Sequence, residues 1–148
     1  MLLLAFAGSS AIAEEAKGSG VGANDVGEIE VTRRDDALRV LKRLDAQLLG
    51  LVVGGDDRFG LAATLHAQQK AWRTYMVSEC ELVGMLVDAG SPWQAVRAVR
   101  CEANLSEQRV LRARAAIRCV QRLPEDQRPL EQGTCLYQLA PMAVPLRP

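Results

Sequence analysis

The chain has 148 residues, of which 49% are hydrophobic, 24% are charged and only 4% are aromatic. This length suits one globular domain, and the hydrophobic content excludes a disordered chain. Its 18 basic side chains equal its 18 acidic ones, whereas nucleic-acid-binding proteins usually carry a basic excess, so we expect no nucleic-acid partner. With few aromatic residues, the core must be built mainly from leucine, valine and alanine, which favours an all-α fold.

The first thirteen residues are typical of an export signal. An apolar stretch, Leu2 to Ala7, is followed by Ala11-Ile12-Ala13, which has the small-x-small form of a cleavage site. The usual positive charge before the apolar stretch is missing, so either the signal is atypical or the true start lies upstream. The stretch is too short to span a bilayer. We expect residues 1–13 to be a signal peptide, no transmembrane segment, and a periplasmic or secreted protein.

Residues 14–31 are rich in glycine, alanine, serine and acidic side chains, and we interpret them as a flexible leader. A first helix is predicted to begin at Thr32, whose hydroxyl can cap the free amides of a helix N-terminus. The Gly54-Gly55 pair is expected to end it. Apolar residues recur at helical spacing between these points: Leu38, Leu41, Leu44, Leu48 and Val52.

A second helix is predicted from about Leu61 to Val87. Its apolar stripe includes one acid, Glu79, and a buried carboxylate without a partner would be costly. We therefore expect a nearby arginine, Arg97 or Arg100, to pair with it. The alternative interpretation is a buried carboxylate with a functional role. The stripe advances in steps of four and three: Leu65, Gln69, Trp72, Met76, Glu79, Val83 and Leu86.

A third, long helix is predicted to follow a tight turn at Gly90. Ser91 suits the N-cap, Pro92 suits the first helical position, and Gln94 completes a capping box. Pro124 is expected to end the helix. Two seven-residue series predict a near-antiparallel helical partner along its length: Val96, Ala103, Val110, Ile117, and Val99, Ser106, Ala113, Val120.

After the third helix we expect a loop with one helical turn near Leu136. The sequence thus predicts a single helical domain over residues 32–140 and a proline-rich tail over 141–148. Its architecture would be a small antiparallel helical bundle built on a long, disulfide-linked helical hairpin.

The disulfide in this hairpin follows from mirrored spacing around the turn. Cys80 lies ten residues before Gly90, and Cys101 lies ten residues after Ser91. At the helical rise of about 1.5 Å per residue, each cysteine would lie about 15 Å from the turn, level with the other. The geometry therefore pairs Cys80 with Cys101.

The remaining pair, Cys119 and Cys135, would then tie the C-terminal segment to the third helix. Four cysteines in an exported chain are typical of two disulfides and an oxidising compartment. Zinc is the competing interpretation, but there is no Cys-x-x-Cys motif and only one histidine. We expect no metal and no cofactor.

The same mirrored spacing places Trp72 opposite Arg109. A guanidinium packed on an indole face contributes about 0.5–2 kcal/mol, and we interpret this pair as structural. The chain has no Gly-x-Ser-x-Gly motif, no phosphate-binding loop and no cysteine left free as a nucleophile. We therefore expect no enzymatic activity and no catalytic residues.

Several residues of the second and third predicted helices, taken in their order along the chain, resemble the LprI-type lysozyme-inhibitor family of small exported bacterial domains. The family pattern is Gln-x-x-Trp-x-x-Tyr-Arg-Asp-x-Glu-Cys, a Gly-Ser turn, and Cys-x-x-x-Leu-Thr-x-x-Arg. Here Met76-Val77 replaces Arg-Asp, and Ser106 stands where threonine is usual. The resemblance covers roughly residues 61 to 112, and the matching residues are Gln69, Trp72, Tyr75, Glu79, Cys80, Gly90, Ser91, Cys101, Leu105 and Arg109.

This resemblance implies a disulfide-linked helical domain that binds and blocks a lysozyme, or that binds another envelope protein. A second hypothesis is a structural module of the cell envelope. Its basic third helix, through Arg112, Arg114 and Arg118, would meet an acidic partner or an anionic lipid surface. The sequence leaves the oligomeric state open.

Overall fold

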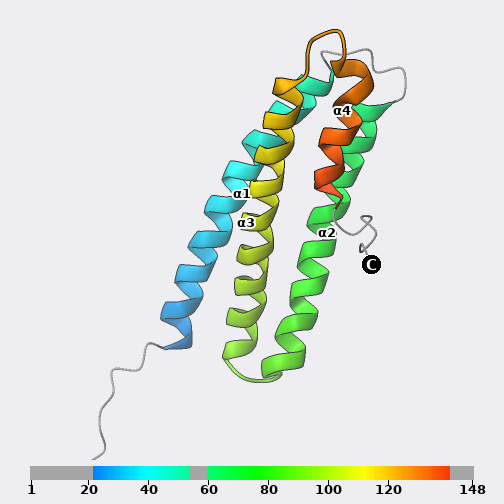
Figure 1. Ribbon diagram of the computed structural model, residues 1–148. Helices are drawn as coiled ribbons and strands as arrows, with labels where there is room; N and C mark the ends of the chain where they lie inside the picture. The colour runs from blue at the N-terminus through cyan, green and yellow to red at the C-terminus, as the bar shows by residue number, and fades with distance from the viewer. Residues whose placement is uncertain (1–21, 54–59, 141–148) are drawn as a thin grey trace, which may run out of the picture.

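A computed structural model describes residues 22–53 and 60–140, and these residues form an all-α bundle (Figure 1). The predicted fold class, a small helical bundle on a disulfide-linked hairpin, is confirmed. Helix α2 runs antiparallel to α1 and α3, which run in the same direction. The elements are α1 (Ala23–Val53), α2 (Leu61–Asp88), α3 (Trp93–Arg122), α4 (Arg128–Leu136) and a 3₁₀ turn, η1 (Tyr137–Leu139).

Helix α1 begins at Ala23, so the predicted start at Thr32 is wrong. The Thr32 hydroxyl donates a hydrogen bond to the Glu28 carbonyl, 2.9 Å away, inside the helix. Residues 23–31, interpreted as leader, are helical because they pack on α3: Gly27 faces Val96, and the side chain of Glu30 is buried. Tertiary contacts here override a composition that is poor for helices. Residues 14–21 lie outside the described part of the chain.

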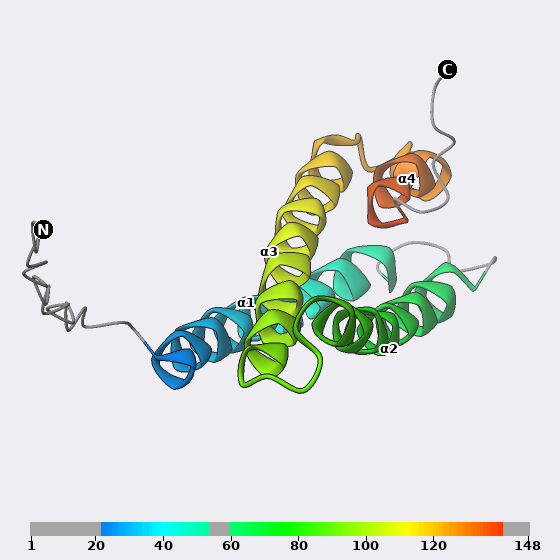
Figure 2. The ribbon, with the colours of Figure 1, turned by 90° about the horizontal axis from the view of Figure 1, so that it is seen from below.

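The main core lies where α1 packs along α3. The side chains of Leu41, Leu48 and Val52 on α1 are fully buried. They pack in one cluster with Ala113 and Ile117 of α3, whose predicted seven-residue series face inward. Burying each large aliphatic side chain contributes roughly 1.5–3 kcal/mol. Figure 2 shows α1 and α3 crossing at an angle, with α4 beside the C-terminal half of α3.

The hairpin of α2 and α3 is joined by the predicted Cys80–Cys101 disulfide, with an S–S distance of 2.07 Å and Cα atoms 5.4 Å apart. Near the turn, α2 lies close against α3 at Gly84, where an added Cβ would lie 2.7 Å from the Gln94 carbonyl oxygen. The contacts between α2 and α3 therefore continue from Cys80 through Gly84 toward the turn. The predicted stripe is wrong at Leu86, which is 75% exposed.

The turn between these helices differs in detail from the predicted capping box. Gly90 adopts a φ of 76°, a left-handed conformation that glycine accepts without strain. The Ser91 hydroxyl accepts a hydrogen bond from the Trp93 amide at 3.2 Å, and the Gln94 side chain accepts one from the Gly90 amide at 2.9 Å. Pro92, rather than Ser91, occupies the N-cap.

The C-terminal segment is more helical than predicted. Helix α3 ends at Arg122, ahead of Pro124 as expected, and α4 and η1 follow where a loop with a single turn was predicted. The predicted Cys119–Cys135 disulfide, with Cα atoms 5.4 Å apart, holds α4 on α3. Buried Leu136 and Leu139 anchor the segment in the core. The predicted signal peptide (1–13) and tail (141–148) lie outside the described residues.

Candidate functional site

A groove of about 430 Å³ lies between α2 and α3. One helical face of each provides its walls, and the end of η1 closes it. Four residues that match the LprI-type pattern meet in this groove: two belong to the part of the pattern on α2 and two to the part on α3, and we call these two parts the half-motifs. The lining residues are Gln68, Ala71, Trp72, Tyr75, Leu105, Gln108, Arg109, Arg112, Leu139 and Ala140.

Arg109 forms the floor of the groove, and it is only 3% exposed. Its guanidinium carbon lies 5.3 Å from the centroid of the Trp72 ring, so the predicted packing of these two side chains is confirmed. Arg109 also donates hydrogen bonds to the Gln68 side-chain oxygen and to the Leu139 carbonyl. The Gln68 amide donates to the same carbonyl at 3.2 Å. Arg109 therefore links α3, α2 and η1.

The charge of this buried arginine has a counterpart on α1. Burial lowers the pKa of Arg109, and the carboxylate of Asp45 opposes that shift, while Arg112 adds to it. Burial likewise raises the pKa of Asp45, against the attraction of Arg73, whose guanidinium lies 3.1 Å away, and of Arg109. Arginine stays protonated in proteins, so the groove floor carries a permanent positive charge.

Arg112 lies one turn beyond Arg109 and is half-buried at the groove. No hydrogen bond or ion pair joins Arg112 to any residue within 22–53 and 60–140. None of the ten lining side chains is acidic. The groove therefore has mainly apolar walls, and both of its charged side chains, Arg109 and Arg112, are positive.

The three arginines predicted as one partner surface are not together. Arg112 lines the groove, whereas Arg114 and Arg118 are exposed on another side of α3. At about 100° per residue, Arg112 and Arg114 point roughly 160° apart around the helix. Arg114 and Arg118 are one turn apart and share a face.

The half-motif residues Gln69 and Glu79 lie away from the groove. Gln69 is buried, and its side-chain nitrogen has no hydrogen-bond partner among the described residues. Glu79 is half-buried. Of its two expected partners, Arg100 bonds Glu30 of α1, and pairing with Arg97 stays a prediction.

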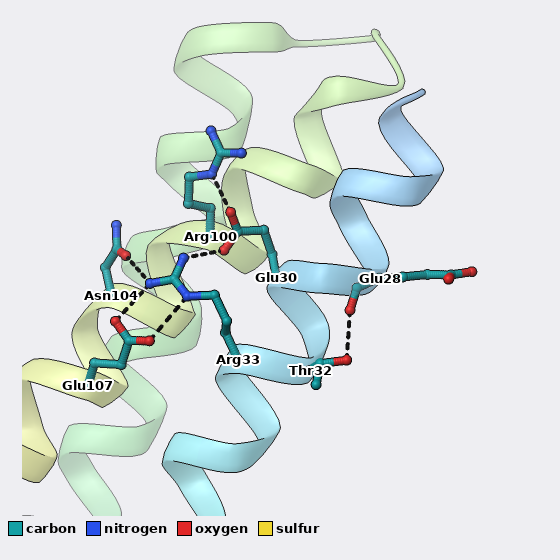
Figure 3. A network of polar contacts seen from close by, with 7 residues as sticks. All are labelled: Glu28, Glu30, Thr32, Arg33, Arg100, Asn104 and Glu107. Atoms are coloured by element: carbon teal, nitrogen blue, oxygen red, sulfur yellow. Dashed lines mark hydrogen bonds and ion pairs between the residues drawn. The ribbon is translucent and has the colours of Figure 1, made fainter. Parts of the chain in front are cut away.

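A second charged cluster joins α1 to α3, and we call it the α1–α3 ion-pair network (Figure 3). The Glu30 carboxylate lies 2.6 Å from Arg33 and 2.7 Å from Arg100. Arg33 also bonds Glu107 at 2.7 Å and the Asn104 side-chain oxygen at 3.2 Å. No local spacing in the sequence reveals this network, because its partners on the two helices are about seventy residues apart in the chain.

A further ion pair between the same two helices joins Arg34 to Glu102 of α3 at 3.1 Å. Both acidic residues of α3, Glu102 and Glu107, are thus paired with α1. Because this cluster is satisfied internally, its role is to hold α1 on α3 rather than to bind a ligand.

The other groove residues could have been found from helical spacing. Gln68, Trp72 and Tyr75 on one helix, and Leu105, Arg109 and Arg112 on the other, each follow the three- and four-residue steps of a single face. Leu139 and Ala140 carry no such signal, because the Cys119–Cys135 bond and the burial of Leu136 bring them to the groove.

The groove lining offers an indole ring, a phenol, amides and a guanidinium, which can contact a partner by stacking, hydrogen bonding and ion pairing. All four cysteines are in disulfides. Across residues 22–53 and 60–140, no group of three histidine, cysteine or acidic side chains is placed to hold a metal ion. In the same residues, no helix has the length and hydrophobicity needed to cross a membrane.

The chain was compared with family models, with curated proteins and with solved structures, and none of the three comparisons gives a match. The likeness to the LprI-type family therefore remains a resemblance carried by the half-motif residues.

Proposed function

We propose that this protein is a non-enzymatic binding domain of the lysozyme-inhibitor type, and that the groove between α2 and α3 is its binding surface. One observation carries this proposal: Trp72 and Tyr75 of one half-motif meet Leu105 and Arg109 of the other in a single groove. Three of these residues, Trp72, Tyr75 and Leu105, line the walls that a partner would touch, and buried Arg109 supports them from the floor.

The composition and rigidity of the groove support a binding role. Tryptophan, tyrosine and arginine are the residue types that most often dominate the energy of protein interfaces. Disulfides fix the α2–α3 hairpin and hold α4 on α3, which reduces the entropy lost when a partner binds. An inhibitor needs only to occlude its target, so it requires no catalytic group.

We propose a periplasmic or secreted location. Two disulfides favour an oxidising compartment, and the N-terminal sequence has the form of an export signal.

The direct test is lysozyme activity in the presence of the purified, oxidised protein. We expect inhibition of at least one lysozyme class, measured as slower clearing of a bacterial cell-wall suspension. Tyr75→Ala should weaken inhibition, because Tyr75 is 43% exposed at the groove. Val77→Ala is the matched control, since Val77 is 42% exposed on α2 but does not line the groove. Full lysozyme activity at a large molar excess, for every class, would refute the proposal.

A second candidate function is binding of an acidic partner or an anionic lipid surface through α3. The supporting observation is that Arg114 and Arg118 are both exposed on one face of α3. We expect this function to appear as retention on vesicles containing phosphatidylglycerol, weakened by salt and by replacing both arginines with glutamine. Retention that does not respond to salt or to these substitutions would exclude it.

A further inference from the structure

The groove has charged side chains of one sign, and only one of them is available to a ligand. The guanidinium of Arg109 is already bonded to Gln68 and Leu139 and packed on Trp72. Arg112 is half-buried beside it and has no hydrogen-bond or ion-pair partner among the described residues. A carboxylate reaching Arg112 would form a charge-assisted hydrogen bond in a partly desolvated place.

The electrostatic surroundings favour an anion at this point. Arg112 is close enough to Arg109 to help lower its pKa, so the two positive charges repel each other. The acid that opposes this effect, Asp45, is on α1 and is engaged by Arg73 at 3.1 Å. An anion bound at Arg112 would add a negative charge on the groove side of these two arginines, where none of the lining side chains is acidic.

The rest of the groove is suited to a large apolar group. Trp72, Tyr75 and Leu105 line its walls, and the smaller apolar surfaces of Ala71 and Leu139 complete the apolar lining. An apolar side chain entering the groove would be removed from water at roughly 25 cal/mol per Å² of buried surface. The cation and the apolar walls are parts of the same groove, so one ligand must satisfy both.

We propose that the groove binds a segment of a partner protein in which a carboxylate side chain lies beside a large apolar side chain. The carboxylate bonds Arg112, and the apolar side chain packs against Trp72 and Tyr75. The inference rests on the proposed function in taking the partner to be a protein. A protein segment is favoured over a free small acid because Tyr75 is 43% exposed and the lining is rich in interface-type residues.

The test uses Trp72 as the reporter. The chain has two tryptophans, and Trp93→Phe removes the one at the start of α3, about 18 Å along the helix from Leu105. In this background the oxidised protein is titrated with N-acetyl-Phe-Glu-amide and with its uncharged counterpart, N-acetyl-Phe-Gln-amide. We expect saturable change in Trp72 fluorescence, with the acidic peptide binding about tenfold more tightly.

Two variants locate the carboxylate contact. Arg112→Gln should abolish the preference for the acidic peptide, whereas Arg114→Gln, on another side of α3, should keep it. Circular dichroism and thermal unfolding show whether each variant remains folded. Equal affinity for the two peptides, no binding of either, or a preference that survives Arg112→Gln in a folded protein would overturn the inference.

A third ligand, 3-phenylpropionate, distinguishes a free acid from a protein segment. Binding of this small acid without binding of the acidic peptide would overturn the inference in favour of a small-molecule site. The lysozyme assay is separate. Selective binding of the acidic peptide without lysozyme inhibition would support the ligand chemistry and refute the lysozyme target. Lysozyme inhibition that is unchanged by Arg112→Gln would support the lysozyme target and refute the proposed carboxylate contact.

Discussion

Arg109 packs on the indole ring of Trp72, with its guanidinium carbon 5.3 Å from the ring centroid. The same guanidinium donates to Gln68 and to the Leu139 carbonyl, so one side chain ties η1 to the α2–α3 hairpin. The pair is therefore both a packing contact and the floor of the groove.

Replacing Arg109 with alanine should destabilise the protein by roughly 2–4 kcal/mol. The substitution removes the cation–π contact and leaves the Leu139 carbonyl with fewer donors in a buried place. Urea unfolding followed by circular dichroism measures the change. Arg114→Ala, at an exposed position, is the control and should alter stability by less than about 0.5 kcal/mol. Equal losses in the two variants would contradict the structural role of Arg109.

Two glycines should respond in opposite directions to alanine. Gly84→Ala places a Cβ 2.7 Å from the Gln94 carbonyl and 3.2 Å from the Ala98 Cβ, so the helices must separate. We expect a loss of about 1–2 kcal/mol, since overpacking outweighs the better helix propensity. Gly50→Ala meets nothing within 4 Å on α1 and should gain about 0.5–1 kcal/mol. Chemical unfolding measures the free energy of unfolding of both variants. A Gly84→Ala variant more stable than the wild type would disprove the close approach.

Glu30 should contribute stability that is lost in acid. Burial acts to raise the pKa of Glu30, but its bonds to Arg100 and Arg33 outweigh this and hold the pKa below its usual value. A carboxyl group whose pKa is lower in the folded state than in the unfolded state, where it is about 4.3, stabilises the fold when the pH is above that unfolded-state pKa. This stabilisation is lost as the pH falls through the pKa of the folded state. The stability difference between the wild type and Glu30→Gln should therefore shrink below about pH 4. A difference that is constant from pH 7 to pH 3 would contradict the pairing.

Asp45 should show the opposite dependence on pH. Its pKa is raised, mainly by burial, so the folded state holds the proton more tightly than the unfolded state does. The wild type should therefore lose stability relative to Asp45→Asn as the pH rises from about 4 through the folded pKa. Unfolding of both proteins at several pH values measures this. A wild type that gains on the variant as the pH rises would show that Arg73 and Arg109 outweigh burial.

Removing the Cys119–Cys135 bond should affect the groove as well as stability. The double substitution of both cysteines by serine should cost about 3 kcal/mol for a loop of this size. It should also weaken peptide binding, because Leu139 and Ala140 reach the groove from the segment that this bond holds. The matched double substitution at Cys80 and Cys101 should cost similar stability with a smaller loss of affinity, measured by Trp72 fluorescence. Equal effects on affinity would show that the C-terminal segment stays in place by itself.

The parts of the fold that were predictable depend on local spacing. The α2–α3 hairpin, the position of its turn and the Cys80–Cys101 disulfide followed from distances along the chain around Gly90. The Cys119–Cys135 disulfide followed as the pairing of the two remaining cysteines. The early start of α1 was not predictable in this way, because Glu30 acquires its partner Arg100 only when α1 lies along α3. Helix α4 was underestimated because nine residues form a weak helix until they are covalently held and buried.

The candidate site was predictable in part. The contact of Trp72 with Arg109 followed from mirrored positions, but the pair was interpreted only as structural. The grouping of Arg112 with Arg114 and Arg118 counted charge along the chain without regard to the helical period, which places Arg112 in the groove and the other two outside it.

The bond between Cys119 and Cys135 makes the complete groove depend on the redox state of the protein. A chain with reduced thiols lacks the Cys80–Cys101 bond between the α2 and α3 walls, and it also lacks the covalent link that holds the end wall from η1. Completion of the binding surface would therefore follow oxidation rather than synthesis. If the groove binds a partner as proposed, the protein would reach its full affinity only after these thiols are oxidised, and would bind that partner more weakly before then.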